Sequence, residues 1–406
     1  MSFHRIGTSN MYDRTIQNIA KQQSDLASQM EHASAGKRVL RPSDDPVAAA
    51  QAERARTRLS RIDSDQRTLE AQTATIAYGE STLGEINGAV QEFRSLIVNA
   101  GNGAFNQTQR DTLVEQLQSL RDQIYAYSNR KDSNGLPLFR GLDTESTTPF
   151  PNGTQGINGG QPNNNEYTIT NTLNGALAFF SGKTGNGVLA VDVGANNKGL
   201  AWSDVGTIKD PAAAAALTTP VTISFRNPDI TPSVAGETTA TEYSLDGTTW
   251  HSYKSGEAIT VAGMQLVITG EAKVGDTFTV KSSETMSLFE TLDAAIATVK
   301  NHGNADGSTD HGALAHGLAK SLAEIDTQLN RVSTVRGVAG ELLNQAERMG
   351  TTLQARGEQM ETQRSNAEDI DMVAALSQLK TQETAVSAAL QSYASIQKLS
   401  LFDYIR

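Results

Sequence analysis

The chain has 406 residues, and its net charge of −11, from 34 basic against 45 acidic side chains, argues against nucleic acid as a partner. It contains no cysteine, which excludes disulfides, zinc–thiolate sites and a cysteine nucleophile. No run approaches the roughly 18 apolar residues of a membrane span, and the first residues lack the apolar segment of a cleaved signal. We therefore expect no membrane insertion, and either a cytosolic location or export by a route that uses no cleaved signal.

Proline and glycine divide the chain into helical arms and a central insert. Two of the ten prolines are Pro42 and Pro46, and the other eight lie between Pro137 and Pro232. Residues 141–275 also hold 18 of the 34 glycines. Proline breaks helices and glycine weakens them. The sequence therefore predicts a multidomain α+β fold, with long coiled-coil-like terminal helices, a rod-like helical bundle and a mainly β insert domain in the middle of the chain.

The first predicted segment, residues 1–41, is an amphipathic terminal helix. Its apolar seam advances by alternating steps of four and three, with one polar member: Tyr12, Ile16, Ile19, Gln23, Leu26, Met30 and Ala33. An isolated helix of this kind is marginal in water. We therefore expect it to stay mobile until a partner covers the seam.

Residues 40–52 read LRPSDDPVAAAQA, and the adjacent Asp44 and Asp45 allow three interpretations. They could be metal ligands, an acid–base pair or the start of a helix. A paired-carboxylate site needs two groups that converge on a cleft, whereas neighbours at a helix start diverge. Ser43 or Asp44 can cap the helix, and Pro46 fits its first turn. We interpret Pro42, Ser43, Asp44, Asp45 and Pro46 as a cap and hinge, at which the prolines stop the terminal helix.

The second segment, residues 42–141, is predicted to form the N-terminal arm of the bundle. A seam recurs every seven residues at Ile62, Leu69, Ile76, Leu83, Val90 and Ile97, joined by Ile86 and Phe93. A second helix follows, with Leu113, Leu117, Leu120, Ile124 and Tyr127 on one face, and can fold back on the first. Arg54, Arg56, Arg58 and Arg61 alternate with polar residues and predict a solvated face.

The insert, residues 142–285, is predicted to be rich in strands. Five segments alternate or are β-branched: 221–225, 241–245, 248–253, 264–269 and 277–281. Asp246 and Gly247 predict a hairpin turn. Residues 149–167, PFPNGTQGINGGQPNNNEY, predict a loop.

Two helical segments follow the insert. Residues 286–364 form the C-terminal arm, whose stripe comprises Leu318, Leu322, Ile325, Leu329 and Val332 and extends to Leu343 and Leu353. Residues 365–406 form a second terminal helix. Its seam mirrors the first, again with one polar member: Met372, Leu376, Leu379, Glu383, Val386, Leu390 and Tyr393. Leu399, Leu401 and Phe402 make its end apolar. The two ends either pair only with each other or also pack against neighbouring subunits, and we favour the second alternative.

A search for catalytic or binding chemistry finds no site. The sequence lacks HExxH, G-x-S-x-G, G-x-x-x-x-G-K-[ST] and a strand-linked G-x-G-x-x-G. His302, His311 and His316 lie near Asp306 and Asp310, but their spacing fits no zinc helix and suits a turn before a helix. We expect no catalytic residue, no cofactor and no metal, and therefore no enzyme.

Several stretches resemble the bacterial flagellin superfamily. SAGKRVLRPSDDPVAAAQA (34–52) is similar to its N-terminal signature, and NAGNGAFNQTQRDTLVEQLQSLRDQI and NGLPLFRG (134–141) are similar to the rest of that arm. Residues 364–405 resemble its C-terminal helix. The tail LSLFDYIR, the form PSDDPVAAAQA and the segment GMQLVITGEAKVGDTFTV (263–280) resemble the members at the hook–filament junction more than filament subunits.

The resemblance implies a structural role outside the cell. Junction members are exported unfolded through the flagellar type III apparatus with a chaperone, and form a ring of copies of themselves between hook-associated protein 1 and the flagellin filament. Their terminal helices form an inner tube, which makes the seam residues of both ends an assembly interface. The alternatives are a filament subunit, and an insert with an enzymatic or adhesive role. An enzyme of the known insert type would need the missing HExxH.

Overall fold

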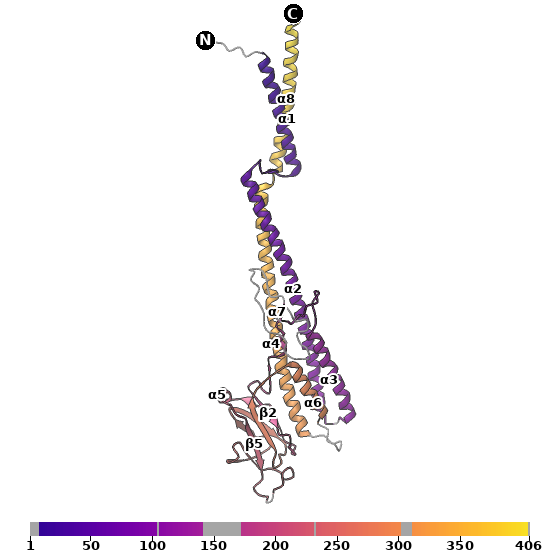
Figure 1. Cartoon of the computed structure of the whole chain (residues 1–406), viewed down its shortest axis with the longest axis vertical. Coiled ribbons are helices and arrows are strands. Elements are labelled where there is room, and N and C mark those ends of the chain that lie inside the picture. Colours follow the sequence, from indigo (N-terminus) through magenta and orange to yellow (C-terminus); the bar gives the residue numbers. More distant parts are fainter. Residues whose placement is uncertain (1–7, 104, 141–171, 231–232, 302–310, 405–406) are drawn as a thin grey trace. The chain divides into compact units, whose positions relative to one another are not determined.

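The computed structural model describes residues 8–103, 105–140, 172–230, 233–301 and 311–404 (Figure 1). It describes no side chains at 8–12, 301, 311 and 396–404. The chain divides into two compact units, one of residues 1–68 with 348–406 and one of residues 69–347. The five segments predicted from the sequence are finer than this division and stay predictions.

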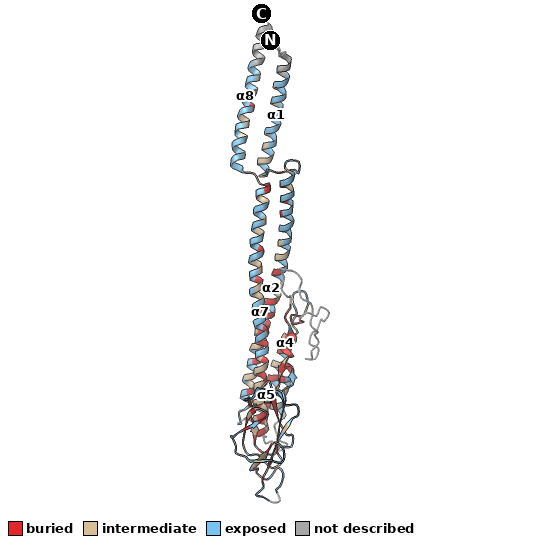
Figure 2. Cartoon of the chain, turned by 90° about the vertical axis from the view of Figure 1, so that its left-hand side faces the viewer, coloured by how far each residue is buried: buried red, intermediate tan, exposed pale blue. Residues whose placement is uncertain are grey.

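The unit that contains both ends of the chain is helical. Its elements are α1 (Thr8–Ala35), α8 (Met372–Tyr404), the start of α2 (Pro46–Ala100) and the end of α7 (His311–Glu368). α1 and α8 lie side by side, and Figure 2 shows both mostly as exposed or intermediate. Val386 is their one buried apolar side chain among the described residues. Little apolar surface therefore holds this helix pair together.

The other unit contains a helical bundle built from the rest of α2 and α7 with α3 (Gln107–Ser128), the short α4 (Gly175–Phe179) and α6 (Leu288–Asn301). The predicted heptad seam of α2 is buried from Leu69 to Ile97, and Leu117 and Ile124 of α3 are fully buried. α6, which the sequence did not single out as a separate helix, packs along α3. The predicted amphipathic stripes therefore form the core of this bundle.

An aromatic cluster joins three of these helices and the segment before α4. Phe289 of α6 lies edge-on to Tyr125 of α3, with ring centroids 5.5 Å apart. It also approaches Phe179 at 6.3 Å, and Phe179 meets Phe139 edge-on at 5.4 Å. Aromatic pairs in such geometry each add about 0.5–1.5 kcal/mol beyond the burial of area. Phe139, Phe179 and Phe289 are buried, so the cluster is a core of the bundle.

The same unit holds the strands, in three antiparallel groups. The five-stranded sheet has the order β2-β10-β5-β6-β7, and the four-stranded sheet has the order β3-β9-β4, with β8 paired to β9. The third group is β1 with β11. The strands are β1 (Gly182–Lys183), β2 (Leu189–Val193), β3 (Trp202–Ser203), β4 (Thr207–Ile208), β5 (Val221–Arg226), β6 (Glu242–Ser244), β7 (Trp250–Ser252), β8 (Ala258–Val261), β9 (Met264–Thr269), β10 (Thr277–Ser282) and β11 (Thr285–Met286). α5 (Pro211–Ala215) lies between β4 and β5.

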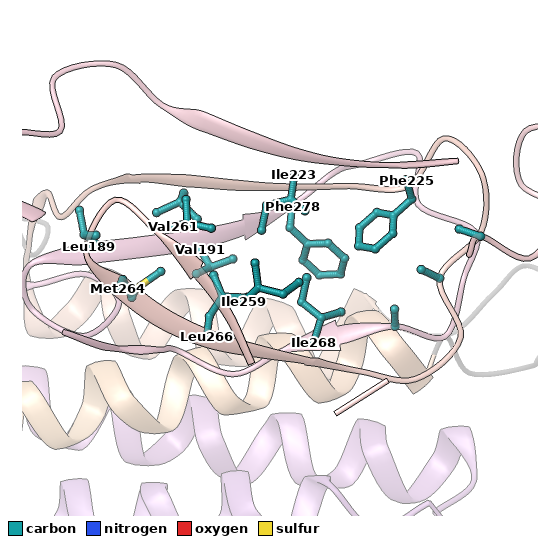
Figure 3. Packing of buried hydrophobic residues seen from close by; sticks show 14 of the residues in the cluster. Leu189, Val191, Ile223, Phe225, Ile259, Val261, Met264, Leu266, Ile268 and Phe278 are labelled. Atoms are coloured by element: carbon teal, nitrogen blue, oxygen red, sulfur yellow. The ribbon is translucent and has the colours of Figure 1, made fainter. Parts of the chain in front are cut away.

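The five predicted strand segments correspond to β5, β6, β7, β9 and β10. Asp246 accepts backbone hydrogen bonds from Thr248 and Thr249 at 2.8 and 2.7 Å, and Gly247 has φ +71°, so the predicted turn joins β6 to β7. Figure 3 shows the core of this domain, with Phe278, Ile223, Leu266 and Ile268 pointing toward one another. The loop predicted at 149–167 lies outside the described residues.

A polar face of α7 holds the β strands. At intervals of four residues, α7 presents His316, Lys320, Glu324 and Gln328 to the segments around β1, β2, β3 and β11. Glu324 is buried and accepts from the backbone of Gly185 at 3.0 Å. Lys320 contacts Asp192, which also pairs with Lys281 of β10 at 2.9 Å. The strand domain is thus attached to the bundle by hydrogen bonds and ion pairs.

His316 predicts how the stability of this unit depends on pH. Its Nδ1 lies 3.0 Å from the Ser203 carbonyl oxygen and its Nε2 lies 3.2 Å from that of Val191. Burial, partly opposed by these contacts, lowers the pKa of His316 below the ordinary 6.5. The unfolded chain therefore takes up a proton at higher pH than the folded chain, and the free energy of unfolding falls as pH drops through 6.5.

The measurement is urea unfolding between pH 8 and 5, for the natural chain and for His316→Gln. The variant should be less stable at pH 8 and should lose less stability on acidification. Glu324 acts in the opposite direction, because burial raises the pKa of its carboxyl above 4.5. Glu324 is present in both proteins, so its contribution to the pH dependence cancels when the two are compared. Equal slopes for the two proteins would contradict the role of His316.

Candidate functional site

The loop between α1 and α2 begins at a glycine. α1 ends at Ala35, and Gly36 follows with φ +67°. The N–H groups of Gly36 and Lys37 donate to the carbonyls of Ala33 and His32 at 3.3 and 3.1 Å, which is the pattern of a Schellman cap. The prediction that prolines stop this helix is therefore wrong, because Gly36 ends it before Pro42 is reached.

Asp45 caps α2. Its Oδ1 accepts from the backbone N–H groups of Val47 and Ala48 at 3.1 and 3.0 Å, and Pro46 is the first helical residue, as predicted. These hydrogen bonds, with that from Arg38, lower the pKa of the Asp45 carboxyl. The prediction that Ser43 or Asp44 caps the helix is wrong, since both lie too early in the chain to reach these donors.

Asp44 closes the loop instead. Its Oδ2 accepts from the backbone N–H groups of Arg41 and Leu40 at 2.8 and 3.0 Å, and the first of these bonds is the main cause of its lowered pKa. The two adjacent carboxylates therefore point to different backbone segments. That divergence fits the structural interpretation of the pair, and the geometry offers no shared cleft for acid–base chemistry.

A buried carboxylate joins this loop to the end of α7. The side chain of Glu368 is 3% exposed and pairs with Lys37 and with Arg56 of α2. Arg364, one turn earlier on α7, approaches its other oxygen at 3.5 Å. Burial raises the pKa of Glu368, but the hydrogen bond from Lys37 and the charge of Arg56 more than offset this and lower it. Arg56 thus has a structural partner, unlike the solvated face predicted for it.

Backbone contacts strengthen the same junction. The N–H groups of Arg38 and Val39 both donate to the carbonyl of Glu368, at 2.7 and 3.3 Å, and Ile370 donates to Gly36 at 3.1 Å. The Arg38 guanidinium also donates to the carbonyl of Ala367 at 2.8 Å. We call the residues 36–46, 56 and 364–370 the hinge junction. It holds the α1–α2 loop against the α7–α8 connection.

Replacing Glu368 with glutamine should weaken the hinge junction. Glutamine keeps the shape but loses the charge that Lys37 and Arg56 face, and hydrogen bonds to charged groups contribute about 1.5–3 kcal/mol each. We expect the free energy of unfolding of this unit to fall by about 1–3 kcal/mol, measured by denaturant unfolding with hydrogen exchange at residues 36–46. Glu358→Gln, on an exposed face of α7, is the control and should cost little. Unchanged protection at residues 36–46 would contradict the prediction.

The α1–α8 pair covers only half of each predicted seam. The described residues of the pair that are at least partly buried are Thr15, Ile19, Gln22, Leu26, Gln29, His32 and Ala33 on α1, and Ala375, Leu379, Gln382, Glu383, Val386, Ala389 and Tyr393 on α8. The side-chain oxygens of Gln22 and Gln29 are buried and have no hydrogen-bond partner among the described residues. Of the polar members predicted for the two seams, Gln23 is exposed, whereas Glu383 is partly buried like its neighbour Gln382.

The other predicted seam residues are exposed. Ile16 is 49% and Met30 52% exposed on α1, and Met372 is 43%, Leu376 53% and Leu390 44% exposed on α8. On each helix these residues form a second stripe beside the first. The side chains of Tyr12, Leu399, Leu401 and Phe402 lie outside the described residues. We call Ile16, Met30, Met372, Leu376 and Leu390 the uncovered stripe.

The described residues were compared with the requirements of a metal site and of a membrane-spanning helix. They contain no group of three or more His, Cys, Asp or Glu side chains that could hold a metal ion. His302 and the side chain of His311 lie outside the described part, and His316 faces backbone carbonyls. No helix of the described residues is long and apolar enough to cross a membrane.

Comparison with known proteins identifies two matching family regions. Residues 6–144 match the bacterial flagellin N-terminal helical region, and residues 322–405 match the bacterial flagellin C-terminal helical region. Flagellar hook-associated protein 3 of Escherichia coli strain K12 is 27% identical over 400 residues, which cover 98% of each chain. Flagellar hook-associated protein 3 of Salmonella typhimurium strain LT2 is 26% identical, over 99% of this chain and all of the relative.

Solved structures share the fold. The flagellar junction protein FlgL from Legionella pneumophila aligns with a TM-score of 0.61 at 24% identity, over 73% of this chain and 99% of that one. FlgL from Xanthomonas campestris aligns with a TM-score of 0.62 at 21% identity, over 77% and 99%. Flagellins match less of the chain. One from Escherichia coli is 29% identical over 131 residues, which is 32% of this chain and 24% of the flagellin.

Proposed function

The chain belongs to the bacterial flagellin superfamily and is a structural protein of the flagellum, and we propose that it forms the junction ring between the hook and the filament. The superfamily predicted from the sequence is thereby confirmed, together with the likeness to its hook-associated protein 3 members. The observation that supports the ring is the uncovered stripe. Apolar residues on helices that already have a partner in the chain leave surface for further subunits.

We propose that the two terminal helices complete their packing only in the assembled ring. The pair buries little apolar surface by itself, with Val386 as its one buried apolar side chain among those described. Neighbouring copies would cover the uncovered stripe of Ile16, Met30, Met372, Leu376 and Leu390. In this arrangement the terminal helices line the inner tube, the helical bundle lies outside them and the strand domain projects outward.

The proposed partners are hook-associated protein 1 on one side, flagellin on the other and copies of this chain within the ring. Export as an unfolded chain through the type III apparatus, helped by a chaperone on the C-terminal region, belongs to the same proposal. Helices of marginal stability that fold only on assembly suit this export route, because a chain that is still unfolded passes through a narrow channel more easily. The protein would then reside outside the cell.

Hydrogen exchange on the purified chain tests the coupling of folding to assembly. Residues 13–35 and 371–395 should exchange quickly in the free protein, because few buried contacts protect their backbone. Residues 69–100 of α2 should exchange slowly. Strong protection of both terminal helices in the free chain would contradict the proposal.

The junction role itself is tested in a strain that lacks the gene. Electron microscopy should show hooks without filaments, and flagellin should be secreted into the medium. Purified protein added to these cells should restore filament growth from existing hooks. Cells that show caps but no filaments would instead indicate that the chain is a filament subunit. The short flagellin match does not favour this alternative.

A further inference from the structure

A groove of about 550 Å³ lies beside the hinge junction, between the start of α2 and the end of α7. Its apolar lining consists of small side chains, with Ala48, Ala55 and Ala367 each at most 6% exposed. Val47 at its rim is 65% exposed. The small residues leave room for a helix or chain segment to approach closely, and Val47 offers it an apolar contact.

Two guanidinium groups at this groove have no acidic partner in the described chain. The first arginine of the lining, Arg38, is paired with Asp45 at 3.2 Å. Arg54 donates to the carbonyl of Ala50 at 3.1 Å, and Arg58 lies 4.0 Å from the sulfur of Met360. In a chain with a net charge of −11, uncompensated arginines on the edge of a groove point to an anionic partner.

An acidic pair with matching spacing lies on α3. Asp111 and Glu115 are exposed and four residues apart, as Arg54 and Arg58 are on α2. Asp111 accepts from the amide of Gln107 at 2.9 Å, and neither carboxylate forms an ion pair within the described chain. Side chains four apart lie one above the other on a helix, about 6 Å along its axis. Two such rows can therefore face each other as two ion pairs.

We propose that the groove binds the acidic face of α3 from a second copy of the chain. The inference deepens the proposed function and rests on it, because it assigns one contact of the ring. The arginine pair and the acidic pair belong to different compact units of the chain. The contact is therefore heterologous, between unlike surfaces, and repeats from copy to copy until a ring closes or a helix continues.

Cross-linking through introduced cysteines tests the contact without background from natural thiols, because the natural chain has no cysteine. Arg58→Cys and Glu115→Cys are introduced together, and flagella from cells that carry only this variant are treated with a short bis-maleimide. A ladder of covalently linked copies is expected. Each single variant should stay monomeric, since a contact between unlike surfaces never brings two copies of one position together.

Charge reversal provides the second readout. Arg54→Glu with Arg58→Glu should lower the fraction of cells with filaments on the order of tenfold, because like charges then face each other. Adding Asp111→Arg and Glu115→Arg to the same chain should restore filaments. Arg61→Glu, on α2 outside the groove, is the matched control. The rescue excludes misfolding as the cause of the loss.

Two failures can be distinguished. If the chain is found in flagella and filaments grow, but the double-cysteine variant gives no ladder and charge reversal has no effect, the α3 contact is wrong and the junction role stands. If the natural chain is absent from purified flagella, the proposed function itself fails. Cross-links in either single-cysteine variant would show contact between like surfaces and overturn the heterologous contact.

Discussion

Replacing Leu376 and Leu390 with aspartate is expected to abolish filament attachment while the chain still folds. Both side chains are exposed in the single chain, 53% and 44%, so a charge there leaves the described packing intact. In the ring these positions would be buried against a neighbour, and an unpaired carboxylate in such a contact costs several kcal/mol. Cells that carry the variant should have hooks, secrete flagellin and lack filaments, as counted by electron microscopy.

The control for this variant lies on the same helix. Ser377 and Ala388 are exposed and lie more than about a quarter of a turn away from the residues of the uncovered stripe on α8. Aspartate at both positions adds the same charge to α8 without entering the stripe, so filaments should form normally. Circular dichroism and secretion of each variant report folding and export. Normal filaments with aspartate at both Leu376 and Leu390 would show that the stripe faces solvent in the assembled structure.

Phe289→Ala is expected to cause the largest loss of stability in the helical bundle. The side chain is 1% exposed and contacts aromatic rings from α3 and α4. Removal of a buried phenylalanine leaves a cavity and typically costs about 3–5 kcal/mol. The free energy of unfolding from denaturant titration should fall by this amount. Export of the variant and filament attachment should also fall at growth temperature. Native proteins are only marginally stable, so this loss is a large part of the total free energy of unfolding.

A neighbouring residue provides the comparison. Leu177 of α4 is 55% exposed, and its replacement with alanine should change the free energy of unfolding by less than about 0.5 kcal/mol. Because both positions belong to the same local structure, a similar loss from both variants would show that α4 is marginal as a whole. In that case the aromatic cluster would not be the core that the contacts between its aromatic side chains indicate.

The periodic parts of the fold could be read from the sequence because one side-chain pattern requires one buried face. The heptad seam of α2, the stripe of α3 and the alternating strands β5, β9 and β10 have the predicted positions. The short strands β1, β3, β4 and β11 have two residues each and no detectable period. The division of the strands between two sheets depends on long-range pairing, so β9 and β10, although consecutive, belong to different sheets.

The candidate site was predicted only in its outline. Both aspartates accept backbone hydrogen bonds at the helix start, but their individual roles differ from those predicted. Which carboxylate caps α2 depends on where the chain turns, and Gly36 rather than Pro42 sets that turn. The partners of Glu368 come from positions more than 300 residues away, at Lys37 and Arg56. No local sequence pattern indicates an ion pair between residues that lie so far apart in the chain.

The sequence by itself determined the helical arms, the central insert, the superfamily and the presence of apolar seams at both ends. These follow from local propensity and periodicity, which do not depend on the rest of the chain. Only the tertiary structure decided which half of each seam α1 and α8 use on each other and which half is left uncovered. It also decided that Arg56 is engaged while Arg54 and Arg58 are free of acidic partners in the described chain. The physical reason is that burial and ion pairing depend on distances between segments remote in sequence, which side-chain order along one helix does not encode.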